Sequence, residues 1–126
     1  MARTALTPVT LTANAVVSDP AGTALDATND HKFTAAAPTS QYLVRVTNTT
    51  SSTKTVQLKA GAGSSATEAG AGDLTLSLTA GNVTPTTKWF GPFSSARFLQ
   101  ADGTVNIDVD ASMTGTVTVF KIPSNF

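Results

Sequence analysis

Residues 88–122 read KWFGPFSSARFLQADGTVNIDVDASMTGTVTVFKI, which is three runs of β-forming residues separated by turn signals. An Asp-Gly pair at residues 102–103 stands between the first and second runs, and such a pair between alternating residues predicts a tight hairpin turn. The second run alternates strictly, so Val105, Ile107 and Val109 fall on one face of a strand and polar residues fall on the other. The stretch therefore predicts a meander of three antiparallel strands, and it contains no catalytic motif.

The third run changes its apolar face part-way along. Val117 and Val119 share a face with Lys121, whereas Phe120 and Ile122 lie on the opposite face. A β-bulge near Val119 would produce this switch, and so would a second face that is covered by another subunit. Both interpretations stand at this point, and the second makes Phe120 a candidate subunit contact.

The remainder of the chain has the same short, alternating runs. Residues 41–49 and 53–59 are separated by turn-forming residues, so they predict a hairpin. No stretch has the 3.6-residue period of an amphipathic helix. We therefore predict one all-β domain over residues 1–126, an antiparallel β-sandwich or barrel of jelly-roll or immunoglobulin-like type. Further strands are predicted at residues 9–12, 31–36 and 74–79, and residues 14–17 are predicted to prolong the strand at 9–12.

Two segments fall outside this strand pattern. Residues 1–7 precede a proline and form an extended N-terminal arm, which is either a frayed end or an arm docked on a partner. Residues 60–72, AGAGSSATEAGAG, are rich in glycine and alanine and nearly uncharged. Ordering so much glycine costs entropy, so we expect this loop to be mobile or to be ordered only by a neighbour.

The composition excludes several classes of function. The chain has no cysteine, which removes disulfides, thiolate chemistry and sulfur-ligated metals. Eight basic residues balance eight acidic ones without a basic cluster, so nucleic-acid binding is disfavoured. No apolar run is long enough for a signal peptide or a membrane span, and we expect an unexported, soluble product that needs no cofactor and no metal.

Few residues suggest chemistry. His31 stands in a turn-rich region, and we interpret it as an exposed turn residue. Asp108 and Asp110 share a strand face about 6.6 Å apart, at ~3.3 Å per residue, which would suit a hard cation or a glycosidase. Because aromatic residues for a sugar cleft are few, we interpret the two carboxylates as a solvated face. The N-x-T sequences at Asn48 and Asn82 are interpreted as polar turns.

Trp89, Phe90 and Phe93 cluster around a Gly-Pro pair. Such a cluster most simply belongs to the core, and the alternative is an anchor at a subunit interface.

The two ends of the chain resemble a known family. The opening, MARTALTPVTLTANAVVSDPAGTALDATND (residues 1–30), and the close, KWFGPFSSARFLQADGTVNIDVDASMTGTVTVFKIP (residues 88–123), together resemble the small head decoration proteins, or capsid cement proteins, of tailed bacteriophages. The resemblance covers both outer thirds of the chain, and the middle third is similar only in character. None of the shared pieces is a catalytic signature.

The resemblance implies a non-enzymatic virion protein. Such a protein binds the outer surface of the major capsid protein lattice, often as a trimer at threefold positions, and reinforces the shell against internal pressure. Two other classes remain open, namely a carbohydrate- or host-surface-binding β-sandwich of a tail or fibre, and a small hydrolase that uses Asp108 and Asp110. The expected capsid or subunit contacts are Arg3, Leu6, Trp89, Phe90, Phe93 and Phe120.

Overall fold

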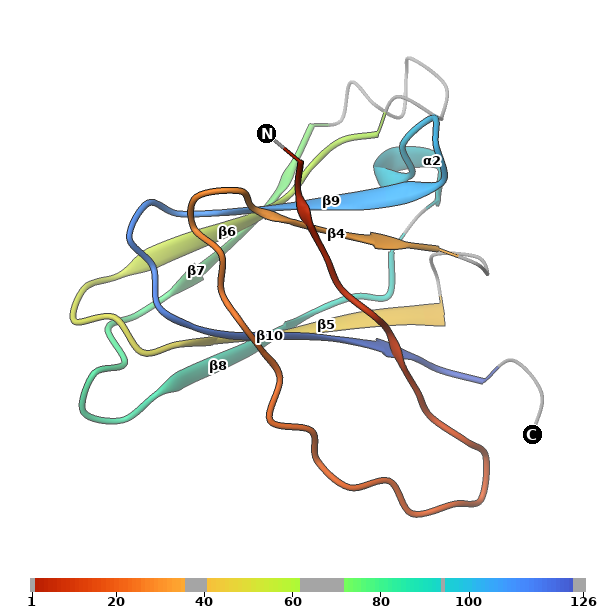
Figure 1. Ribbon diagram of the computed structural model, residues 1–126, viewed down its shortest axis with the longest axis horizontal. Helices are drawn as coiled ribbons and strands as arrows, with labels where there is room; N and C mark the ends of the chain where they lie inside the picture. Colours follow the sequence, from red (N-terminus) through yellow and green to blue (C-terminus); the bar gives the residue numbers. More distant parts are fainter. Residues whose placement is uncertain (1, 36–40, 62–71, 94, 124–126) are drawn as a thin grey trace.

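The computed structural model describes residues 2–35, 41–61, 72–93 and 95–123, which form two facing β-sheets (Figure 1). Sheet A contains β1 (Thr4–Ala5), β4 (His31–Thr34), β9 (Thr104–Val109), β6 (Lys54–Leu58) and β7 (Leu74–Leu78), in that order. Sheet B has the order β2 (Val9–Thr10), β10 (Gly115–Lys121), β5 (Tyr42–Asn48) and β8 (Thr86–Phe90), and β3 (Thr23–Ala24) also pairs with β10. The helical turn α2 (Ser95–Phe98) joins β8 to β9. The prediction of an all-β sandwich is confirmed.

The inward-facing residues of the two sheets form one hydrophobic core. Strand β5 alternates buried and half-buried residues along its whole length, as a strand with one face in the core should. Phe33 of sheet A packs against Tyr42 of sheet B with ring centroids 5.3 Å apart, so side chains of the two sheets touch directly. Each such buried side chain contributes roughly 1.5 to 3 kcal/mol relative to exposure. Val105, Ile107 and Val109 of β9, which were predicted to share one face of the strand, are all buried.

The predicted order of strand pairing is wrong in two places. Residues 88–122 do not form a meander, because β8 and β10 flank β5 in sheet B whereas β9 lies in sheet A. Residues 41–49 and 53–59 do not form a hairpin, because β5 and β6 belong to different sheets. In both cases consecutive runs place their apolar faces opposite each other across the core, so the connecting turn crosses from one sheet to the other instead of reversing within one.

The run before Asp102 is a strand only at its start, over residues 88–90 of β8. Residues 95–98 form α2, and the Asp-Gly pair makes a local turn in which Gly103, at φ 82°, donates from its backbone to Gln100 O over 3.0 Å. A tight turn forms at the Asp-Gly pair as predicted, but it does not join two strands of a hairpin, because α2 leads into it and β8 and β9 lie in different sheets.

The N-terminal segment makes the sheets mixed instead of antiparallel. Strand β1 pairs in parallel with β4, and β2 pairs in parallel with β10. Figure 1 shows this segment crossing the sandwich from sheet A to sheet B. The arm predicted at residues 1–7 is thus neither frayed nor docked on a partner over its described residues, because β1 joins the chain's own sheet and Leu6 is buried in its core.

Strand β10 has no bulge, since it pairs residue for residue with β5 from Gly115 opposite Asn48 to Lys121 opposite Tyr42. Its second face is covered by the chain itself. Phe120 is 5% exposed and packs on Trp89 of β8 with ring centroids 5.3 Å apart. The apolar residues of β10 therefore switch faces because a second layer of the chain covers the outer face of sheet B, as described below. Residues 62–71 of the predicted glycine-rich loop lie outside the described residues.

Candidate binding surface

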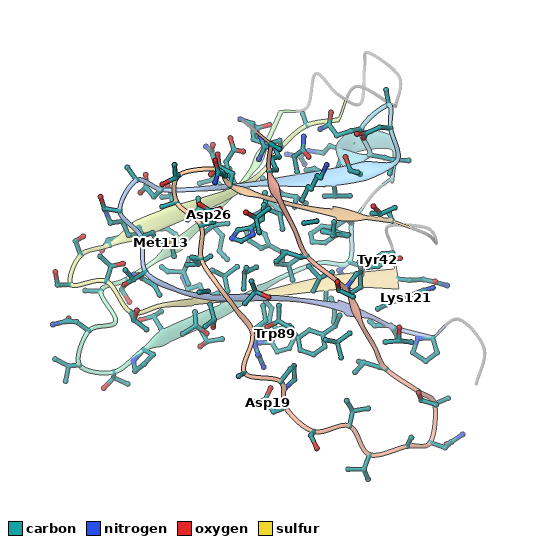
Figure 2. All side chains as sticks on the ribbon, in the orientation of Figure 1. Asp19, Asp26, Tyr42, Trp89, Met113 and Lys121 are labelled. Atoms are coloured by element: carbon teal, nitrogen blue, oxygen red, sulfur yellow. The ribbon has the colours of Figure 1, made fainter. Side chains whose placement is uncertain are left out.

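Trp89 is the large aromatic side chain that the described part of the chain leaves most exposed, at 52%. It lies on β8 and points away from the core toward the segment that contains Asp19 (Figure 2). Strand alternation explains this direction, because Phe90, its neighbour, takes the inward position and is 3% exposed. Trp89 therefore marks the outer face of sheet B.

Arg45 joins this face to residues 18–22. Its guanidinium carbon lies 5.9 Å from the Trp89 ring centroid and 5.3 Å from that of Phe120, within the range of cation–π attraction. The same guanidinium forms an ion pair with Asp19 and donates to Pro20 O over 2.7 Å. The Arg45 side chain is only 12% exposed, whereas that of Asp19 is 83% exposed, so the guanidinium is held against the sheet and the carboxylate faces solvent.

The backbone at Gly22 packs closely against β10 of sheet B. Gly22 has a φ of 90°, and a Cβ at this position would lie 2.7 Å from Thr118 Oγ1 of β10. Only glycine combines this backbone conformation with so close an approach. Residues 18–22 are thereby fixed as a second layer over sheet B.

Residues 11–17 extend beyond that layer. Figure 1 shows the loop standing out from the body of the sandwich. Val16 is fully exposed and Val17 is 41% exposed, so two adjacent aliphatic side chains face solvent. The predicted continuation of the first strand over residues 14–17 is not formed, and Asn14 turns the chain with a φ of 59°. We refer to Val17, Trp89 and the hollows that they border, together with the adjacent Val16, as the Trp89 surface.

Two hollows flank the Asp19–Arg45 ion pair. One, of about 460 Å³, is largely apolar. The other, of about 500 Å³, is rich in threonine hydroxyls. Trp89, Arg45, Asp19 and Pro20 border both hollows, the apolar one being completed by Leu11, Val17, Ser18, Leu43 and Phe120, and the polar one by Ala21, Thr47, Thr87 and Thr116. The surface therefore offers apolar side chains for packing and hydroxyl groups for hydrogen bonds. The charges of Asp19 and Arg45 offset each other within it.

The other predicted contact residues are not available in the same way. Leu6, Phe90 and Phe93 are between 3% and 6% exposed and belong to the core. Phe120 is covered by its own chain, and Arg3 pairs with Asp108 at 2.6 Å. The predictions for Leu6, Phe90 and Phe93 need correction, because these side chains face the core. Arg3 and Phe120 stay predictions, and Phe120 borders the apolar hollow beside Trp89.

His31 is buried at 0% exposure, so the interpretation as an exposed turn residue is wrong. It occupies the same inward face of β4 as Phe33, two residues later.

Asp108 and Asp110 are bound within the fold. Arg3 and Lys59 lie 2.6 and 3.7 Å from the Asp108 carboxylate, and Asp110 accepts a hydrogen bond from the backbone of Thr55 over 3.1 Å. Both carboxylates are half-buried and partnered instead of forming a solvated face or an open pair for a substrate. Within the described ranges, no three His, Cys, Asp or Glu side chains are grouped to hold a metal ion.

Comparisons with protein-family models, curated proteins and solved structures find no match to this chain. In the part of the chain that the structure describes, no helix is both long and apolar enough to cross a membrane.

Replacing Arg45 by methionine is expected to loosen residues 18–22. The apolar stem would still pack between the two rings, but the ion pair with Asp19 and the bond to Pro20 O would be lost. We expect residues 11–20 to be cleaved several times faster by a non-specific protease, and global stability to fall by about 1 to 2 kcal/mol. As a control, Lys88→Met removes an exposed lysine that donates to Ser77 O. Equal cleavage rates in the wild type and Arg45→Met would contradict the anchoring role.

Proposed function

We propose that this chain is a capsid decoration protein of a tailed bacteriophage, which binds the outer surface of the shell through the Trp89 surface and stabilises the particle. One observation carries the choice of surface. Of the four large hydrophobic side chains that are exposed in the described residues, Val17 and Trp89 border the same hollow, Val16 is the neighbour of Val17 in the chain, and Val83 lies in the turn before β8. Concentrated apolar exposure on one face is typical of an interaction site.

The resemblance of residues 1–30 and 88–123 to the capsid cement proteins supports the identity of the partner as the major capsid protein lattice. The observed fold is compatible with this role, because the sandwich closes its own core and leaves an outer layer free for contacts. Both resembling stretches also contribute to the Trp89 surface, since the loop at 11–22 comes from the first stretch and Trp89 and Phe120 come from the second.

The energetics suit binding in many copies. Burying an aliphatic or aromatic side chain contributes roughly 1.5 to 3 kcal/mol, so the few exposed side chains of one copy give modest affinity once association costs are subtracted. Repetition over a symmetric lattice, and assembly as a trimer at threefold positions, would raise the overall binding through avidity. A formal net charge of zero limits repulsion between crowded copies.

The test is binding of the purified protein to shells that lack it. We expect Trp89→Ser and Val16→Ser each to weaken binding at least tenfold and to reduce the gain in heat resistance of the particles, because each removes an apolar contact. Bound copies are measured by co-sedimentation, and folding of each variant is checked by its unfolding transition. The matched control is Val83→Ser, which removes an equally exposed valine outside the surface. Unchanged binding by both surface variants would overturn the proposed surface, and a wild type that does not bind shells would overturn the function.

A second candidate is a carbohydrate- or host-surface-binding module of a tail or fibre. The observation that favours it is the exposed Trp89 ring beside a hollow lined by threonine hydroxyls and Asp19. Sugars stack on such rings and bond to such groups. Binding on a glycan array that is lost in Trp89→Ala, without binding to shells, would support this candidate.

A further inference from the structure

His31 lies buried where the N-terminal strand meets the rest of sheet A. Its Nε2 accepts a hydrogen bond of 2.9 Å from the backbone N–H of Asp26. A nitrogen that accepts a hydrogen bond carries no proton, so the ring is neutral in this arrangement. A proton on Nε2 would set two N–H groups against each other inside the protein, where an unsatisfied donor is costly.

The turn that His31 holds is the same turn that holds β1. Thr4 donates from its hydroxyl to the Asp26 carboxylate over 2.6 Å and from its backbone to Asp30 O over 2.9 Å. Beyond the turn, Leu6 donates from its backbone to Lys32 O over 2.8 Å. Strand β1 is only two residues long and forms the edge of its sheet, so the bonds at this junction add to the burial of Leu6 in holding it.

Several charged groups surround the imidazole. Asp26 and Asp30 approach from the preceding turn. Arg3, just before β1, donates to His31 O over 3.4 Å, and Asp108 of β9 pairs with Arg3. From sheet B, Tyr42 is the titratable residue turned into the core, where it packs on Phe33.

Burial lowers the pKa of His31, although the charges of Asp26 and Asp30 partly oppose this effect. The hydrogen bond from Thr4, followed by those from Asn29, holds the pKa of Asp26 far below its usual range, so this carboxylate stays ionised under mildly acidic conditions.

We infer that His31 is an acid-sensitive latch, which helps to hold β1 on the sandwich while neutral and weakens this hold when protonated. While β1 is held, His31 Nε2 accepts a hydrogen bond and cannot take up a proton, whereas it can be protonated when β1 is detached. The latch is therefore fully closed above about pH 6.5, the ordinary pKa of histidine, and it weakens as the pH falls below that value. Because the chain has a single histidine, no other imidazole contributes to a response in this range.

The experiment is amide hydrogen exchange of the wild-type protein at pH 7.5 and 5.5, with intrinsic exchange rates divided out. We expect the protection of the Thr4 and Leu6 amides to fall severalfold relative to the amides of β5. A single proton limits the change to at most about tenfold per pH unit. If the protection of the Thr4 and Leu6 amides, relative to the amides of β5, were the same at pH 7.5 and pH 5.5, the latch would be overturned.

Two variants sharpen the result. His31→Gln supplies a neutral oxygen that can accept the Asp26 bond but does not titrate, so the pH-dependent difference should disappear. Arg3→Gln removes an anchor that does not titrate in this range, so protection of Thr4 and Leu6 should fall by the same factor at both pH values. A pH-dependent difference that persists in His31→Gln would assign the response to another group and overturn the proposal. If His31→Gln does not fold, the wild-type comparison decides.

Discussion

Replacing Asn48 by aspartate is expected to destabilise the fold by about 4 kcal/mol or more, although the two side chains have nearly the same shape. Asn48 is 0% exposed at the end of β5, where the chain crosses between the sheets. Its Nδ2 donates to the backbone oxygens of Ser52, Leu78 and Thr79, over 3.2, 3.3 and 2.9 Å, and its Oδ1 accepts from the backbone of Thr50 over 2.9 Å. A carboxylate would place negative charge against three carbonyl oxygens and leave them without a donor.

Denaturant unfolding measures this loss directly. The control is Asn82→Asp, which makes the same chemical change at an exposed asparagine in the turn before β8. Burial among carbonyl oxygens would raise the pKa of the introduced carboxyl, and its protonated form can again donate one bond. We therefore expect part of the loss to be recovered as the pH is lowered toward 5. A loss below about 1 kcal/mol at pH 7 would contradict the role of Asn48 as the tie between the sheets.

Removing residues 1–7 is expected to cost roughly 5 kcal/mol, which is comparable to the whole stability of many domains of this size. Truncating a buried leucine alone costs about 2 to 5 kcal/mol, and Leu6 is 6% exposed within the core. The deletion also removes the backbone bonds of β1 and the contact of Arg3 with Asp108.

Thermal unfolding of the truncated chain tests this expectation. The control deletes only residues 1–2, which precede the contacts of Arg3 and should leave the unfolding temperature unchanged. Full stability after removal of residues 1–7 would show that β1 is a dispensable arm. The expected result has a practical consequence, because lost occupancy on capsids after this deletion would reflect unfolding and would not identify a contact site.

Much of the fold was predictable because alternation reports directly which side chains face the core. Val105, Ile107 and Val109 were placed correctly from their spacing alone. Alternation does not report which strand lies beside which, so the crossings between sheets and the parallel pairing of β1 and β2 were missed. Asn48 illustrates the reason, since its role depends on carbonyl oxygens of Leu78 and Thr79 that are distant in sequence.

Of the residues that border the candidate surface, Trp89 and Phe120 were predicted from the sequence. Arg45 carried an available signal, because a charged residue between Val44 and Val46 in a central strand needs a partner on its outer face. The burial of His31 also had a signal in the sequence, because His31 lies two residues before Phe33 and therefore shares the buried face of the strand. The exposure of Val16 had no local signal, because an aliphatic pair in a turn-rich segment looks the same whether it packs inward or outward.

Imaging purified particles of the parent virus by electron cryomicroscopy tests the proposed function most directly. We predict copies of this sandwich on the outer capsid surface, with Trp89 and the loop at residues 11–22 turned toward the shell. Particles that lack the chain would contradict the function, and copies whose Trp89 surface faces solvent would contradict the proposed mode of binding.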